Sequence, residues 1–228
     1  MADAPRISVL IPALDERASV ATAVGNAFRT VRPVDVTVVD GGSRDGTGAV
    51  AAEAGAAVVG GGANRGKALN AAAARTEGDV LLFVHADSSL PDGAGDAIRS
   101  AMRSADWGAF RIRFDPPLPL LERLVLWRSK LWHAPYGDQA MFVSRTALDA
   151  VGGVPPIPLM DDYELARRLR RRFRFQLLDL AVVTSARRYQ RDGVLRTTLR
   201  LRLLFLLYRL GVPPDRLLQR YSAARTTN

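Results

Sequence analysis

Short runs of β-branched and other apolar residues recur through the first half of this chain, and stretches with helical spacing separate them. The apolar runs cover residues 7–11, 36–40, 57–60 and 80–84. The helical stretches cover residues 18–30, 46–54 and 66–76. This alternation is typical of βαβ units, whose strands lie parallel in one sheet. The pattern therefore predicts an α/β fold.

The second half of the chain changes pattern. A helix predicted over residues 92–104 leads to an alternating strand at 109–114, which ends at a proline-rich stretch. Later strands are expected at 139–143 and 176–184, around a helix at 162–172. No internal repeat or low-complexity linker divides the chain, so we expect a single domain over residues 1–228. The predicted architecture is a mixed, mostly parallel central sheet flanked by helices.

Composition narrows the class of protein. The chain is 48% hydrophobic and 24% charged, as ordinary globular proteins are, and it has no cysteine for disulfides or thiolate metal sites. No basic leader followed by a long apolar stretch opens it, so a cytoplasmic location is expected. The net charge of +9 is almost wholly arginine, since Lys67 and Lys130 are the only lysines. Such a charge attracts nucleotides, nucleic acid or anionic lipid, although solvated arginines explain it equally well.

The tail over residues 195–210 has leucines at helical spacing, interrupted by arginines. It is too short and too charged to span a bilayer. Two interpretations stay open. The helix packs on the domain, or it lies on a membrane surface.

Carboxylates follow three of the predicted strands, where ligands of open α/β sheets bind. Glu16 follows the first strand, close to Pro12. Asp40 ends the second strand and opens a glycine-rich loop, and Asp87 follows the fourth. Asp87 could hold Mg²⁺ or Mn²⁺ that bridges phosphate oxygens. For the acidic pair Asp15 and Glu16, the alternative is that they only cap the helix that follows.

A basic turn enters the third predicted helix. Its Arg65 and Lys67, with the helix amide dipole behind them, could hold a diphosphate. Solvated surface charge is the alternative.

These clusters together resemble glycosyltransferase family 2 and its GT-A fold, a nucleotide-diphospho-sugar transferase fold. The matching segments are P-A-L-D-E at 12–16, D-G-G-S-R-D-G-T at 40–47, H-A-D at 85–87, G-D-Q at 137–139 and M-D-D-Y-E-L at 160–165. The likeness covers nearly the whole chain. It is greatest to small members named as arsenosugar-biosynthesis or radical-SAM-associated glycosyltransferases.

The resemblance implies a role for each matching residue. Asp40 would read the nucleobase, with Pro12 and Glu16 beside the base and ribose. Arg65 would meet the nucleotide, which we expect to be UDP, and Asp87 would hold the metal on the diphosphate. His85 stands where the family has the first carboxylate of its D-x-D motif, which puts the number of metal contacts in doubt.

The catalytic step implied is an inverting single displacement with Asp162 as general base. Asp161 and Glu164 have capping-box spacing, which predicts Asp161 as the helix N-cap. In the segment that follows the last long strand, Arg187 or Arg188 could offset the charge of the leaving group. The arginine run over 167–174 is interpreted as a solvated helix face.

On this hypothesis residues 5–107 form the nucleotide-sugar half, residues 108–192 the acceptor and catalytic half, and residues 193–221 an amphipathic basic helix. The partners are a nucleotide-sugar donor and a small-molecule or lipid-linked acceptor, with no nucleic acid, and the last helix could contact a membrane. One rival is a sugar-phosphate nucleotidyltransferase, whose Gly-rich, arginine-containing loop after the first strand is absent here. Another is a non-catalytic basic module on RNA or membrane.

Overall fold

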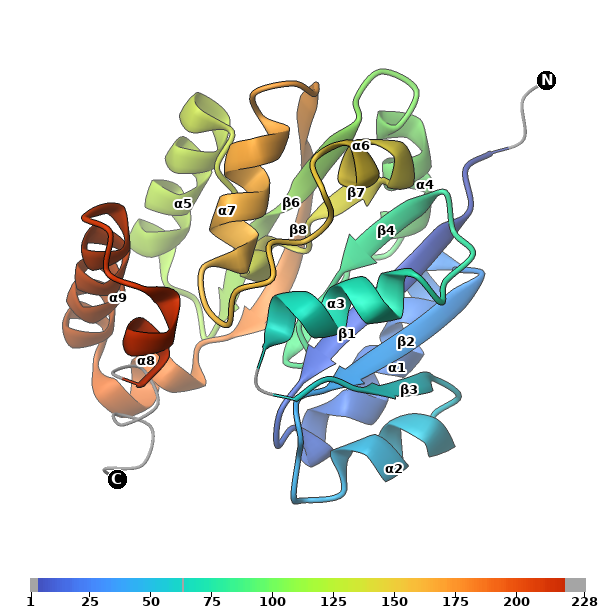
Figure 1. Cartoon of the computed structure of the whole chain (residues 1–228), viewed down its shortest axis with the longest axis horizontal. Helices are drawn as coiled ribbons and strands as arrows, with labels where there is room; N and C mark the ends of the chain where they lie inside the picture. Colours follow the sequence, from blue (N-terminus) through green and yellow to red (C-terminus); the bar gives the residue numbers. More distant parts are fainter. Residues whose placement is uncertain (1–3, 63, 220–228) are drawn as a thin grey trace.

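The computed structural model describes residues 4–62 and 64–219. Within them one sheet runs in the order β3-β2-β1-β4-β7-β6-β8-β5 (Figure 1). Its strands are β1 (Ile7–Ala13), β2 (Asp35–Asp40), β3 (Ala57–Gly60), β4 (Val80–Phe83), β5 (Ser88–Ser89), β6 (Trp107–Asp115), β7 (Phe142–Ser144) and β8 (Phe175–Ser185). Strands β1 to β4 are parallel, and so are β6 and β8, whereas β7 runs against both β4 and β6. The expected mixed, mostly parallel α/β sheet is confirmed.

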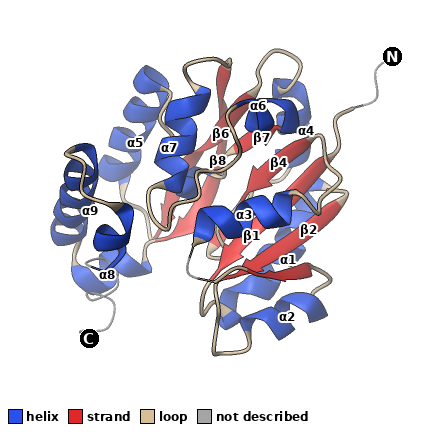
Figure 2. Ribbon diagram, viewed as in Figure 1, coloured by secondary structure: helices blue, strands red, loops and turns tan. Residues whose placement is uncertain are grey.

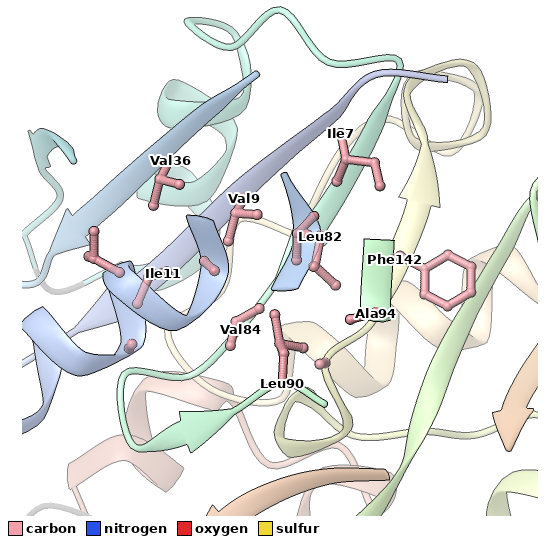
Figure 3. Packing of buried hydrophobic residues seen from close by; sticks show 14 of the residues in the cluster. Ile7, Val9, Ile11, Val36, Leu82, Val84, Leu90, Ala94 and Phe142 are labelled. Atoms are coloured by element: carbon pink, nitrogen blue, oxygen red, sulfur yellow. The ribbon is translucent and has the colours of Figure 1, made fainter. Parts of the chain in front are cut away.

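Helices cover both faces of this sheet (Figure 2). They are α1 (Arg17–Val31), α2 (Thr47–Glu53), α3 (Arg65–Ala73), α4 (Ala94–Ala101), α5 (Pro119–Trp132), α6 (Arg145–Ala150), α7 (Asp161–Leu169), α8 (Arg187–Asp192) and α9 (Val194–Arg209), with a 3-10 turn η1 (Gly137–Gln139). Strand β1 shows why two layers form. Ile7, Val9 and Ile11 pack with α1, α2 and α4, as Figure 3 shows in part, whereas Leu10 points to the layer of α3, α6 and α7.

Several predicted elements differ from the structure. The strand expected over 139–143 is wrong at its start, because Gly137–Gln139 forms η1 and the strand begins at Phe142. Helix α5 falls in a stretch where the sequence offered no motif, and α6, α8 and the two-residue β5 were not predicted. The basic helix expected over 193–221 ends at Arg209, and residues 220 and 221 lie outside the described residues.

Helix α9 packs on the domain through a face that the leucine pattern did not indicate. Its buried residues are Thr197 and Leu204, and Phe205 meets Tyr163 edge to face at 4.8 Å. The leucines at positions 195, 199, 203, 206 and 210 are all more than half exposed. Among the described residues, no helix has the length and apolar character needed to cross a membrane.

Candidate active site at the carboxyl edge of the sheet

Strand β7 runs antiparallel to its neighbours, and this direction determines which loops lie together. Since β1, β2, β4, β6 and β8 all point the same way, their carboxyl ends share one edge of the sheet. The antiparallel β7 brings its amino end, and η1 before it, to that same edge. Loops from both halves of the chain therefore surround one stretch of the edge, where open α/β sheets bind ligands.

The loops after β1 and β2 are joined by hydrogen bonds. The N–H of Asp15 donates to Ser43 Oγ, and the N–H of Glu16 donates to Thr47 Oγ1, each at 2.9 Å. Asp40 Oδ1 accepts hydrogen bonds from Ser43 Oγ and from the backbone N–H groups of residues 42 and 43. This carboxylate therefore holds its own loop in shape, beside the loop of Glu16.

The second carboxylate oxygen of Asp40 faces the start of α2. A Cβ added to Gly48 would lie 3.1 Å from Asp40 Oδ2, so glycine at this position leaves room for the carboxylate. Pro12 pairs in register with Val39, next to Asp40. Pro12 and Asp40 thus lie on adjacent strand ends, and their contact with a nucleobase stays a prediction.

Arg187 joins two acidic residues from the first half of the chain. Its Nη2 contacts Glu16 Oε1 and lies 3.6 Å from Asp87 Oδ2. Glu16 and Asp87 are 13% and 24% exposed, whereas Arg187 is 55% exposed, so the guanidinium covers the acids from the solvent side. The pairing of β5 with β8 explains this arrangement, because it brings residue 185 to the backbone of Asp87.

Asp162 and His85 meet around Gly137. Asp162 Oδ2 accepts a hydrogen bond from the N–H of Gly137 at 2.7 Å, and Oδ1 accepts one from the N–H of Tyr163 at 2.7 Å. A Cβ on Gly137 would lie 2.9 Å from His85 Nε2 and 3.1 Å from Asp162 Oδ2. Only glycine lets the imidazole and the carboxylate approach the loop this closely.

Burial lowers the pKa of His85 to about 4; the charges of Arg65 and Arg188 contribute to this fall, whereas those of Asp87 and Asp162 oppose it. The imidazole is therefore neutral near pH 7. Arg188 itself is exposed at the start of α8. Its charge acts on His85, whereas its neighbour Arg187 contacts the acids.

The structure corrects the interpretation of Asp161 as an N-cap. Met160, with a left-handed backbone, is the N-cap of α7, and Asp161 is buried as the first residue of the helix. Asp161 accepts two hydrogen bonds from Arg65, one at 2.9 Å from Nε and one at 2.7 Å from Nη2. Burial raises the pKa of Asp161, although the Arg65 charge opposes the rise. Instead of capping its own helix, Asp161 forms an ion pair with a residue 96 positions earlier in the sequence.

Arg65 also lies 4.0 Å from Asp162, so the basic turn and the expected general base are close. Asn64 caps α3 by accepting a hydrogen bond from the N–H of Lys67 at 3.0 Å, and the Lys67 residue is exposed. The guanidinium of Arg65 is therefore already held in place by Asp161 before any ligand binds. Contact of either basic residue with a diphosphate stays a prediction.

Asp138 is a residue that sequence reasoning did not single out, although the G-D-Q segment contains it. Its Oδ1 is buried without a hydrogen-bond partner in the described residues. Burial raises the pKa of Asp138 to about 6, Arg128 opposes the rise, and Asp162 and Asp87 add to it. Asp138 therefore belongs electrostatically to the same acidic cluster. The neighbouring Gln139 is structural, since its Oε1 accepts hydrogen bonds from the side chains of residues 128 and 129.

The described residues contain no cluster of three or more His, Asp or Glu side chains suited to a metal ion. Asp87 supplies one partly exposed carboxylate, and His85 supplies a neutral imidazole two residues away. This donor set fits a divalent cation that takes most of its ligands from a bound diphosphate, because Mg²⁺ commonly uses one or two protein carboxylates in such sites. It does not fit a metal held by protein alone.

Comparison with known proteins gives a family for part of the chain. Residues 8–106 match the family model described as "Glycosyl transferase family 2". No curated protein sequence matches the chain. The sequence-based resemblance to this family is confirmed over the matched residues, and the narrower arsenosugar branch stays a prediction.

Solved structures extend the likeness to most of the fold. A mannosyltransferase from Pyrobaculum calidifontis, in complex with GDP-Man and Mn²⁺, has a TM-score of 0.66 at 20% identity, covering 94% of this chain and 67% of that one. Glucosyl-3-phosphoglycerate synthase from Mycobacterium tuberculosis, with Mn²⁺, UDP-glucose and phosphoglyceric acid, has a TM-score of 0.55 at 20% identity, covering 92% and 81%. TarS 1–349 from S. aureus, with UDP-GlcNAc, has a TM-score of 0.63 at 16% identity, covering 79% and 58%. At these identities the likeness establishes the fold, which is that of the GT-A glycosyltransferases.

Proposed function

Since residues 8–106 of the chain are a glycosyl transferase family 2 segment on a GT-A fold, we propose that the protein transfers a sugar from a nucleoside diphosphate sugar to an acceptor hydroxyl. The observation that carries the proposal is the meeting of distant charged residues at one sheet edge. Arg187 contacts Glu16 and Asp87, and Asp162 lies beside Arg65 and His85. We expect UDP as the nucleotide.

In this proposal the donor lies over residues 5–107. Pro12, Glu16 and Asp40 line the base and ribose, which is consistent with their positions on adjacent loops after β1 and β2. Arg65 and Lys67, at the start of α3, face the diphosphate. The mannosyl-, glucosyl- and GlcNAc-type donors named for the similar structures make a nucleotide sugar the first ligand class to test.

Asp87, with His85 beside it, would hold Mg²⁺ or Mn²⁺. When bound, the cation would offset negative charge on the diphosphate. The two similar structures that contain Mn²⁺ support testing this metal first.

The proposed transfer is a single displacement with inversion. The acceptor oxygen attacks the anomeric carbon while its proton passes to the Asp162 carboxylate, and the bond from that carbon to the diphosphate oxygen breaks. The leaving nucleoside diphosphate keeps the electron pair. The N–H groups of Gly137 and Tyr163 orient the carboxylate at 2.7 Å each, which supports Asp162 as the base.

Arg187 and Arg188 would offset the charge that develops on the leaving diphosphate. Arg187 is more than half exposed and paired to Glu16 and Asp87, so a diphosphate could replace those carboxylates as its partner. The acceptor, a small molecule or a lipid-linked one, would enter from the side of residues 108–192.

The proposal is tested by thermal unfolding with a panel of UDP-sugars and GDP-mannose, with and without Mn²⁺. A ligand at about 100 times its Kd stabilises the folded state by roughly 2.7 kcal/mol, which is a clear rise in Tm. The matching donor should also release its nucleoside diphosphate slowly, with water as acceptor. Release of pyrophosphate from a nucleoside triphosphate and a sugar phosphate would instead identify a nucleotidyltransferase. RNA binding that falls steeply with salt, with no response to nucleotides, would identify a non-catalytic basic module.

A further inference from the structure

Helix α5 presents an apolar stripe to the solvent. Its exposed members, at spacings of four, three and four residues, are Leu120, Leu124, Trp127 and Leu131. These spacings place all four on one face of a helix. Trp127 is 57% exposed, and Trp132 at the end of the helix is 63% exposed. Surface helices normally turn such a stripe towards the core.

Helix α9 repeats this arrangement. Its exposed leucines follow one another at spacings of four, four, three and four residues, at positions 195, 199, 203, 206 and 210. Thr197 and Leu204 lie on the opposite face and are buried. We call the stripes of α5 and α9 together the outer face: Leu120, Leu124, Trp127, Leu131, Leu195, Leu199, Leu203, Leu206 and Leu210.

Positive charges border the outer face on both helices. Along α9, at 100° per residue, Arg202 and Arg209 fall on one border of the stripe and Arg196 and Arg200 on the other. Helix α9 contains no acidic residue. On α5, Arg123 and Lys130 lie along one border of the stripe.

The one acidic residue of α5 points away from this charge. Glu122 Oε1 accepts hydrogen bonds from the N–H groups of Phe114 and Leu118, so its carboxylate is turned towards β6. The charged side chains that these two helices place beside the outer face are therefore all positive, although Asp192, just before α9, lies near Arg196 and Arg200.

The two helices lie at the same end of the molecule, beyond β6 and β8 and far from β3 (Figure 1). A chain of contacts connects them. Arg128 of α5 lies 3.4 Å over the ring of Tyr136, and that ring is 6.5 Å from the ring of Phe205 on α9. The outer face is thus carried by helices that are held against the same part of the domain.

We propose that the outer face docks on the surface of an anionic lipid bilayer, with the leucines and tryptophans in the headgroup region and the arginines against the lipid charges. An apolar stripe bordered by arginine, with tryptophan at its edge, is the composition of helices that lie in the plane of a membrane interface. A second copy of the chain is disfavoured as the occupant, because two such faces would bring arginine against arginine. RNA is disfavoured because bases stack on aromatic rings, whereas this face is mostly leucine.

Flotation of the full chain with vesicles tests the proposal without any sugar transfer, so its outcome is independent of the proposed function. We expect binding to phosphatidylcholine vesicles containing about 30% phosphatidylglycerol, and much weaker binding to phosphatidylcholine alone. Each arginine near an anionic surface should contribute about fivefold in partitioning. Trp127 and Trp132 should shift their fluorescence to shorter wavelength on binding, whereas Trp107 is already buried.

Two double variants separate the contribution of the apolar side chains from that of the arginines. Trp127→Gln with Leu131→Gln should weaken partitioning at least tenfold, and Arg196→Gln with Arg202→Gln should weaken it about 25-fold on anionic vesicles only. The matched controls, Val34→Gln and Arg103→Gln, change exposed residues elsewhere and should bind as the unaltered chain does.

Equal binding by all variants, or no binding to either vesicle, would overturn the proposal. So would a concentration-dependent dimer in sedimentation that the same outer-face substitutions abolish, because that result would assign the face to a second copy. Circular dichroism of each variant confirms that loss of binding is not loss of fold.

Discussion

Arg65 and Asp161 form a two-point ion pair that joins the start of α3 to the start of α7. The Asp161 side chain is 2% exposed and the Arg65 side chain 34%. The pair connects the layer over the nucleotide half to the helix that carries Asp162. It therefore fixes the position of the proposed base relative to the basic turn.

Replacing Arg65 with Met should lower stability markedly, because Asp161 would keep a buried carboxylate without its partner. Breaking a buried pair costs about 3–5 kcal/mol, and the partial exposure of Arg65 reduces this to about 2–4 kcal/mol. For a chain of this size Tm should fall by roughly 4–16 °C in calorimetry. Adding Asp161→Leu should recover part of the loss. Arg29→Met, which breaks an exposed pair with Asp92, is the control and should cost under about 1 kcal/mol.

Asp162→Asn should lower donor turnover by about 10²- to 10⁴-fold, since the amide cannot take the acceptor proton. Asparagine can still accept the hydrogen bond from Gly137, so the loop and nucleotide affinity should be kept. Release of nucleoside diphosphate measures turnover, and calorimetric titration measures affinity. Asp149→Asn, at an exposed position of α6, should leave both unchanged. Unimpaired turnover in Asp162→Asn would remove this residue from the mechanism.

Arg187→Gln should reduce kcat about 10²-fold if the guanidinium stabilises the leaving diphosphate. Its effect on stability should stay within about 1 kcal/mol, because Arg187 itself is more than half exposed and water can solvate the side of Glu16 that it leaves. Arg191→Gln removes a neighbouring pair of similar exposure, between half-exposed Arg191 and Asp192, and should not alter kcat. A Tm loss in Arg187→Gln as large as that of Arg65→Met, with normal kcat, would make Arg187 a structural residue instead.

Asp138 should make stability fall as pH rises. Its pKa is about 6 in the folded protein against an ordinary 3.8, so between these values the folded state binds more protons than the unfolded state. The penalty grows from about pH 4 to pH 6 and is complete above it. A shift of this size corresponds to roughly 3 kcal/mol, so Asp138→Asn should raise Tm at pH 7.5 by roughly 6–12 °C and have little effect near pH 4.

His85 acts in the opposite direction, because its pKa is lowered and it costs stability as pH falls from about 6.5 to 4. At each pH, the Tm of the unaltered chain is subtracted from the Tm of Asp138→Asn. The difference no longer contains the contribution of His85, because both chains share it. A Tm difference that does not change between pH 4 and pH 7.5 would contradict the role given to Asp138.

The regular part of the fold was predictable from the sequence chiefly because its central strands β1, β2 and β4 are buried on both faces. The runs of β1 and β4 consist mostly of apolar residues, and their predicted bounds differ from the observed ones by two residues or fewer. Helix α5 was missed for a physical reason. Its leucines have helical spacing, but the proline-rich stretch before it was interpreted as the end of regular structure, whereas Pro119 is the first residue of the helix. The leucine spacing of α9 correctly indicated a helix but not which face is buried.

The positions of Asp40 and Asp87 at one edge of the sheet were predictable, since a strand end fixes the edge on which a residue lies. The site was not predictable where partners are distant. Asp161 has a capping sequence around it, yet Arg65 is the group it binds. Asp138 could not be recognised as buried before η1 and its surroundings were known.

The reversed strand β7 has a consequence for dividing the chain. It lies between β4 and β6, so a fragment that stops near residue 107 would leave the whole length of β4 without a neighbour on that side. Such an exposed edge strand is prone to pairing with strands of other molecules. Chimeras that exchange acceptor specificity should therefore keep residues 142–144 with the recipient, and should graft only the surrounding loops and helices.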